Sequence, residues 1–191
     1  MEEVNTTNIY YPPGGILMWI IIFLELFTFG IALVVLVTNS KEDPTIFHQS
    51  RLSLNTTYGA INTLFLLTSG FFMTTTVHQF KENNIKKASL FLKLTMLGGL
   101  LFLILKGFEY YLKINAGYTF GFNSFYTFYW LLTGFHVIHV IVGLFLLLLV
   151  YLGINKPNSE DKLEDIEASA TFWHMCDLIW LLLFPTLYLI L

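Results

Sequence analysis

Charged residues are scarce in this chain. Its 191 residues include 10 Lys and Arg and 13 Asp and Glu, so that 12% are charged, whereas 55% are hydrophobic. Soluble domains carry about a quarter charged residues. The shortage therefore argues against an ordinary soluble domain and predicts a membrane protein, for which we expect no nucleic-acid partner.

Cysteine is almost absent as well. Cys176 is the only one in the sequence, which excludes an intrachain disulfide and a metal site built from several cysteines. It lies inside an apolar run, and we interpret it as a small packing residue. Internal repeats are not evident either, so the inverted-repeat architecture of many transporters is not indicated.

The chain does contain five apolar runs long enough to cross a bilayer. A hydrocarbon core of about 30 Å takes about 20 helical residues. The predicted helices cover residues 15–38, 55–79, 89–112, 124–153 and 171–191. We predict an all-α integral membrane protein, a bundle of five transmembrane helices that forms a single domain over residues 1–191.

Basic residues predict the orientation of this bundle, because an odd number of helices puts the two ends of the chain on opposite sides. The N-terminal side has Lys81, Lys86, Lys87, Lys93, Lys156 and Lys162, and the other side has Lys41, Arg51 and Lys113. Basic loops stay in the cytoplasm, so we predict a cytoplasmic N-terminus and a periplasmic C-terminus. The start of the chain does not resemble a secretory signal, and we expect the first helix to remain in the mature protein.

One acidic residue, Glu25, stands near the middle of the first apolar run. An acidic residue at the centre of a membrane helix costs about 2.5 to 3.5 kcal/mol, and such residues usually face the protein interior or a water path. We therefore expect Glu25 to point inward, towards a partner.

Helical spacing groups the other polar residues of the apolar runs. His136 and His139 share one face of the fourth run, and His174 and Asp177 lie one turn apart in the fifth. In the third run Lys106, Glu109 and Lys113 are spaced as a salt-linked helix end. A stripe of small and polar residues in the second run, which includes Gly59, Asn62, Ser69, Gly70 and Thr76, is typical of closely packed membrane helices.

Two interpretations of the histidines stay open. His136 and His139 can reach one site, with His174 as a third ligand for zinc, iron or copper. Alternatively, all three hydrogen-bond to acids, hydroxyls or neighbouring backbone, as buried histidines of membrane helices more often do. The chain has no Glu-x-x-His motif of a di-iron bundle.

Four segments of the sequence resemble one family, subunit III of the haem-copper terminal oxidases. Residues 23–30 (FLELFTFG) are similar to its acidic residue followed by aromatics, and residues 106–111 (KGFEYY) to its Glu-Tyr at a helix end. Residues 134–143 (GFHVIHVIVG) resemble its Gly-x-His-x-x-His-Val-x-x-Gly helix. Residues 167–180 (EASATFWHMCDLIW) resemble its Glu-Ala followed by Trp-His-x-x-Asp-x-x-Trp, which ends here at Trp180.

The resemblance implies an accessory, non-catalytic subunit of the short, five-helix bacterial form, in the inner membrane. It would hold no haem, copper or other metal of its own and would pack against catalytic subunit I and subunit II of a respiratory oxidase, which carry those cofactors, or within a larger supercomplex. A bound phospholipid is compatible with it, although this chain would lack the two extra helices that form the lipid cleft of longer members. The family's buried polar residues map here onto Glu25, Glu109, His136, His139, His174, Asp177 and Trp180.

The implied role is support of stability, proton uptake and sustained turnover in a neighbour that reduces oxygen to water. We hypothesise that Glu25 hydrogen-bonds between helices near the oxidase interface and that the other polar residues fix the bundle. The simpler alternative is that these side chains only satisfy one another. A subunit of a nitric oxide reductase or quinol oxidase, a b-type haem electron carrier that uses His136 or His139 with His174, and a small proton-coupled transporter also remain as alternatives.

Overall fold

The computed structural model describes residues 12, 14–154 and 162–190, and these form helices joined by short connections. The long helices are α1 (Ile16–Glu42), α3 (Thr56–Lys81), α4 (Ile85–Asn115), α5 (Ser124–Gly153) and α6 (Lys162–Pro185), which continues into a π-helical turn, η1 (Thr186–Ile190). Five of the described segments are long and apolar enough to cross a membrane. The protein is an all-α integral membrane protein with five transmembrane helices, as predicted.

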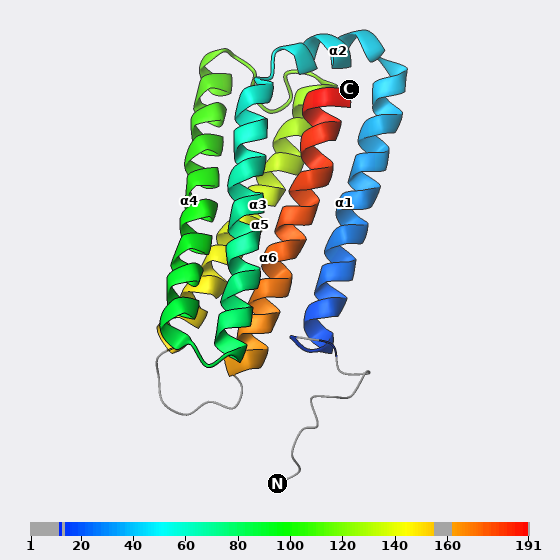
Figure 1. Ribbon diagram of the computed structural model, residues 1–191. Coiled ribbons are helices and arrows are strands. Elements are labelled where there is room, and N and C mark those ends of the chain that lie inside the picture. The colour runs from blue at the N-terminus through cyan, green and yellow to red at the C-terminus, as the bar shows by residue number, and fades with distance from the viewer. Residues whose placement is uncertain (1–11, 13, 155–161, 191) are drawn as a thin grey trace.

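The helices stand side by side, with α3 and α4 forming the most extensively packed pair (Figure 1). Helices α5 and α6 pack against this pair, and α1 stands at the edge of the bundle beside α6. A short helix, α2 (Pro44–Leu52), lies across one end. The start of α1 and the end of η1 are at opposite ends of the bundle. Lys156 and the side chain of Lys162, used above for orientation, lie outside the described residues.

Two elements differ from the sequence prediction. Helix α6 begins at Lys162, whereas the apolar run begins at Thr171. The intervening residues include Glu164, Asp165 and Glu167, which continue the helix although hydropathy does not detect them. Helix α2 was not predicted because it is short and polar, yet its start follows ordinary rules: Pro44 occupies the first turn, and the Asp43 side chain accepts a hydrogen bond from the backbone of Ile46.

Asparagine residues form the N-caps of two of the membrane helices. The Asn55 side chain accepts a hydrogen bond from the Thr57 backbone at 2.9 Å, at the start of α3, and that of Asn123 accepts one from the Tyr126 backbone at 2.8 Å, at the start of α5. Each supplies a partner for a backbone N–H that the first turn of a helix leaves free. Asn83, with φ of 56°, makes the tight turn between α3 and α4.

The core is built where aromatic side chains of α6 meet glycines of its neighbours. Trp173 is fully buried, and its ring lies against Gly99 of α4 and Gly143 of α5, where a Cβ atom would come within 2.5 and 2.9 Å of the indole. Its Nε1–H donates to Ser69 Oγ of α3 at 3.0 Å. One tryptophan of α6 thus contacts all three of these helices, and the small residues make room for it.

Candidate functional site

Glu25 and His139 form the most direct polar link between α1 and the rest of the bundle. Glu25 Oε2 lies 3.2 Å from His139 Nε2 of α5, and the Glu25 side chain is 26% exposed. His139 Nδ1 lies 2.8 Å from the Phe135 carbonyl oxygen. A carbonyl oxygen only accepts, so Nδ1 donates to it, and Nε2 faces the Glu25 carboxyl. Glu25 therefore does point to a partner, as expected, although part of it stays on the surface.

Aromatic rings surround this pair. Phe29 of α1 stacks on Phe135 with ring centroids 5.3 Å apart and meets the His139 ring edge-on at 5.6 Å. Phe172 of α6 lies parallel to His139 at 6.3 Å. Few other side chains of α1 are buried. The described contacts of α1 in this region are thus a small apolar cluster and the Glu25–His139 pair.

His136 behaves differently from His139. It is fully buried, its ring stacks on Trp180 at 5.3 Å, and it meets Phe102 edge-on at 5.5 Å. Neither of its ring nitrogens has a hydrogen-bond partner within the part of the chain that the structure describes. His136 is therefore packed as an aromatic ring, although helical spacing correctly places it on the buried face of α5 with His139.

His174 and Asp177 pair on the side of α6 that faces α3. His174 Nδ1 lies 3.5 Å from Asp177 Oδ2, and His174 Nε2 lies 3.2 Å from Thr74 Oγ1 of α3. The carboxylate packs directly on Gly70, where a Cβ atom would collide with it. The His174 side chain is 44% exposed whereas Asp177 is buried, so His174 brings this cluster to the surface of the bundle within a membrane span.

Trp180 joins α6 to α3 and α5. Its Nε1–H donates to Thr63 Oγ1 of α3 at 3.0 Å, and its ring contacts His136 as described. The helical spacing that groups Trp180 with Asp177 and His174 is correct, but their surroundings differ: Trp180 is fully buried, whereas His174 is not.

Glu109 forms a fully buried ion pair with Lys106, and two tyrosine hydroxyls hydrogen-bond to both members of the pair. Lys106 Nζ donates to Glu109 Oε2 at 3.0 Å, to Tyr129 OH at 3.2 Å and to Tyr188 OH at 2.7 Å. Both tyrosine hydroxyls donate to Glu109 Oε1, at 3.0 Å from Tyr129 and 2.7 Å from Tyr188. Every proton of the ammonium group has an acceptor, which is the condition for burying a charge.

The same cation is enclosed by aromatic faces. Lys106 Nζ lies 4.8 to 5.3 Å from the ring centroids of Tyr110, Tyr129, Trp180 and Tyr188, which is within reach of the ring quadrupoles. We name Lys106, Glu109, Tyr129 and Tyr188 the buried ion cluster. It joins α4 and α5 to η1, so η1 is held by charge as well as by packing.

Sequence reasoning identified part of this cluster. The Lys106–Glu109 pair was expected as a salt-linked helix end, but Lys113 is not the third member: its Nζ donates to the Ser53 carbonyl between α2 and α3. Tyr188 was missed. Its position after Pro185 gives no periodic signal, and its contact with Glu109 spans 79 residues of sequence.

The three histidines of the alternative metal site lie in three different surroundings. His139 pairs with Glu25, His174 with Asp177 and Thr74, and His136 with two aromatic rings. Among the described residues, no group of three or more His, Cys, Asp or Glu side chains is arranged to hold a metal ion. The geometry does not favour a shared site for His136, His139 and His174.

Comparison with known proteins identifies the family. Residues 15–190 match the family described as cytochrome c oxidase subunit III. The chain belongs to this family. The resemblance seen in the four sequence segments is thereby confirmed.

Individual members of the cytochrome c oxidase subunit III family match 67% of this chain. The chain is 36% identical over 129 residues to cytochrome c oxidase subunit 3 of Drosophila melanogaster and 38% identical over 132 residues to that of Rhipicephalus sanguineus. It is 34% identical over 129 residues to cytochrome c oxidase subunit 3 of Spodoptera frugiperda, where the match covers 86% of that sequence. It spans about half the length of the other two, 48% and 49%.

Proposed function

We propose that this protein is an accessory subunit III of a respiratory haem-copper oxidase and carries no redox cofactor of its own. The match to the subunit III family over residues 15–190 carries the proposal. The partners would be a catalytic subunit I and a subunit II, which hold the haem and copper and reduce oxygen to water. The chain would support the stability of this complex, proton uptake and sustained turnover.

Polar side chains on the lipid-facing surface of the bundle support the proposal that a partner subunit packs there. His174 is 44% exposed and Glu25 26% exposed at the side chain, and both lie within membrane-spanning helices. Polar and ionisable groups in the hydrocarbon region are costly unless protein or water covers them. A packed neighbour of the same complex would cover both.

The proposed role of Glu25 is to hold an exchangeable proton beside the neighbour while tying α1 to α5. Replacing Glu25 by Gln separates these functions, because the Gln amide can still donate to His139 Nε2 but does not titrate. In the assembled oxidase we expect Glu25→Gln to shorten the active lifetime while the subunit stays bound. The matched variant Glu25→Leu also removes the hydrogen bond and should loosen α1. Unchanged rate and lifetime in Glu25→Gln would leave only the structural role.

We also propose the bacterial inner membrane as the location, with the N-terminus in the cytoplasm. The exposed lysines Lys86 and Lys87 lie at the α3–α4 turn, at the same end of the bundle as the start of α1, and support this orientation through the positive-inside rule. Single cysteines placed at Lys87 and at Thr119 should react with an impermeant maleimide from the cytoplasmic and periplasmic sides respectively. The native Cys176 is buried and should stay unlabelled. The reverse pattern would contradict the orientation.

The alternatives make separate predictions. A partner that reduces nitric oxide, or that accepts electrons from quinol, would be recognised by the activity of the co-purified complex. A b-type haem carrier would show a Soret band with stoichiometric haem in the separated chain. A proton-coupled transporter would be active in proteoliposomes without partners. The separate surroundings of the three histidines argue against the haem carrier.

A further inference from the structure

An apolar groove of about 410 Å³ lies between residues 28–32 of α1 and residues 130–138 of α5, and we name it the α1–α5 groove. Three aromatic rings line it, from Phe29, Trp130 and Phe135. Phe29 and Phe135 also contact the His139 ring, so one end of the groove lies about one helical turn from the Glu25–His139 pair. Because both helices span the membrane, a ligand would enter the groove from the lipid.

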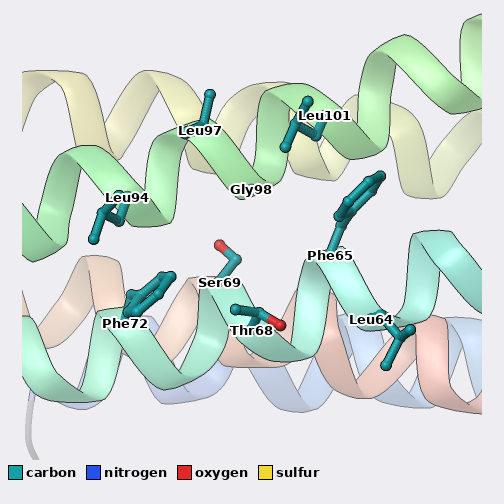
Figure 2. Close-up of a pocket in the computed structure, with 9 residues that line it drawn as sticks. All are labelled: Leu64, Phe65, Thr68, Ser69, Phe72, Leu94, Leu97, Gly98 and Leu101. Carbon is teal, nitrogen blue, oxygen red and sulfur yellow. The ribbon is translucent and has the colours of Figure 1, made fainter.

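This end of the groove differs from a second groove, between α3 and α4, in its polar atoms. In the second groove the buried hydroxyl is already engaged (Figure 2): Ser69 Oγ donates to the Thr95 carbonyl oxygen at 2.8 Å and accepts from Trp173 Nε1 at 3.0 Å. Beside the α1–α5 groove, Glu25 Oε2 faces His139 Nε2, and within the described part of the chain Oε1 has no hydrogen-bond partner. Glu25 therefore has an oxygen atom left for a ligand.

The depth of Glu25 limits what this ligand can be. Glu25 lies nine residues after the first residue of α1, or about 14 Å along the helix axis. Half of a hydrocarbon core is about 15 Å thick. A charged phosphate at this depth would be costly, and none of the described residues that line the groove is basic. The polar group of the ligand must therefore be small and neutral.

The carboxyl group limits the ligand further. A carboxyl accepts a hydrogen bond whether or not it carries a proton, whereas it donates one only when it is protonated. Glu25 can therefore bind a hydroxyl group in both of its protonation states, but a carbonyl group in only one of them. The aromatic lining favours a flat ring beside that hydroxyl, and the side that faces lipid leaves room for an apolar tail.

We propose that the α1–α5 groove binds a membrane quinol, with its ring against the three aromatic side chains and one hydroxyl donating to Glu25. The apolar tail extends into the lipid. A phospholipid tail would fill the groove as well, but its headgroup would not reach Glu25. The inference requires that α1 and α5 span the membrane, and it does not depend on the oxidase assignment.

Competition for a fluorescent quinol analogue, heptylhydroxyquinoline N-oxide, tests the proposal on the full chain in phosphatidylcholine nanodiscs. Decylubiquinol should displace the analogue at an about fivefold lower concentration than decylubiquinone does, which is the difference expected for one hydrogen bond. Decane, which has a tail but no hydroxyl, should displace it poorly. Equal displacement by decylubiquinol and decylubiquinone, or by decylubiquinol and decane, would overturn the proposal, because the hydroxyl would then not be recognised.

Two pairs of variants test the groove and the carboxyl separately. Leu131→Trp should fill the groove and weaken binding of the analogue, whereas Leu149→Trp, at a similarly exposed position of α5 outside the groove, should not. Glu25→Leu should weaken binding of decylubiquinol about fivefold, whereas Glu25→Gln keeps an acceptor oxygen and should bind it as the wild type does.

Helical circular dichroism shows whether each variant is folded, so that weaker binding is not mistaken for unfolding. Three results would overturn the proposal: no binding of the analogue to the wild type, equal binding in Leu131→Trp and Leu149→Trp, or full binding of decylubiquinol in Glu25→Leu. Loss of decylubiquinol binding in a folded Glu25→Gln to the same extent as in Glu25→Leu would also contradict it, because an acceptor oxygen would then not be sufficient.

Discussion

Removing Lys106 should destabilise the protein far more than removing Lys106 and the charge of Glu109 together. In Lys106→Met the Glu109 carboxylate keeps its two tyrosine donors but loses its counter-charge in a site where both residues are about 1% exposed. Breaking a buried pair in this way typically costs about 3 to 5 kcal/mol. The methionine fills most of the volume of the lysine stem, so a cavity adds little.

The double variant Lys106→Met/Glu109→Gln should recover much of that loss. The neutral amide no longer needs a cation, and its carbonyl oxygen can still accept from Tyr129 and Tyr188. We expect a coupling free energy of about 2 kcal/mol or more between the two sites. The free energy of unfolding of the wild type, the two single variants and the double variant is measured in mixed micelles. The loss of helical circular dichroism reports unfolding. If the two single losses simply added in the double variant, the ion pair would not be the interaction that stabilises the cluster.

Three further predictions concern the packing around the site. Tyr188→Phe should cost about 1 to 3 kcal/mol of unfolding free energy, because it removes one partner each from Lys106 and Glu109, and limited proteolysis should then cut η1 earlier than in the wild type; an unchanged cleavage rate would contradict its role. Gly143→Val should cost about 1 to 3 kcal/mol by pressing on Trp173, whereas Gly134→Ala, where a Cβ atom meets nothing within 4 Å, should be neutral; equal melting shifts would refute this. His139→Phe should raise the reactivity towards maleimide of a cysteine placed at Ile22 of α1, which is buried in the wild type, because the variant breaks the link to Glu25; labelling at the wild-type rate would show that this link does not position α1.

The sequence predicted the membrane helices well because hydropathy depends on single segments. All five spans were found, and the stripe of α3 and the histidine face of α5 are buried as their spacing indicated. The predicted start of α6 was wrong, and α2 was not predicted at all. In both places charged and polar residues form helix outside the apolar runs. Asp43 and Pro44 were a usable signal for α2 that hydropathy alone does not weigh.

The residues of the candidate site were easier to predict than their partners. Helical spacing indicates which side chains share a face, but it does not indicate which helix they meet. Glu25 pairs with His139, whereas His136, one turn away, stacks on Trp180. Lys106 of α4 meets Tyr188 of the π-helical turn η1 across 82 residues of sequence. Contacts of this kind depend on how the helices pack against one another. The periodicity of a single sequence does not indicate which residues of different helices will meet.

The most direct test of the oxidase assignment is to purify the full chain from its own membranes in mild detergent and measure what accompanies it. We expect a complex with a many-helix partner, with haem and copper in fixed ratio to this chain and with oxygen consumption. Separated from that partner, the chain should be colourless. A chain that purifies alone, or that carries the haem itself, would contradict the assignment.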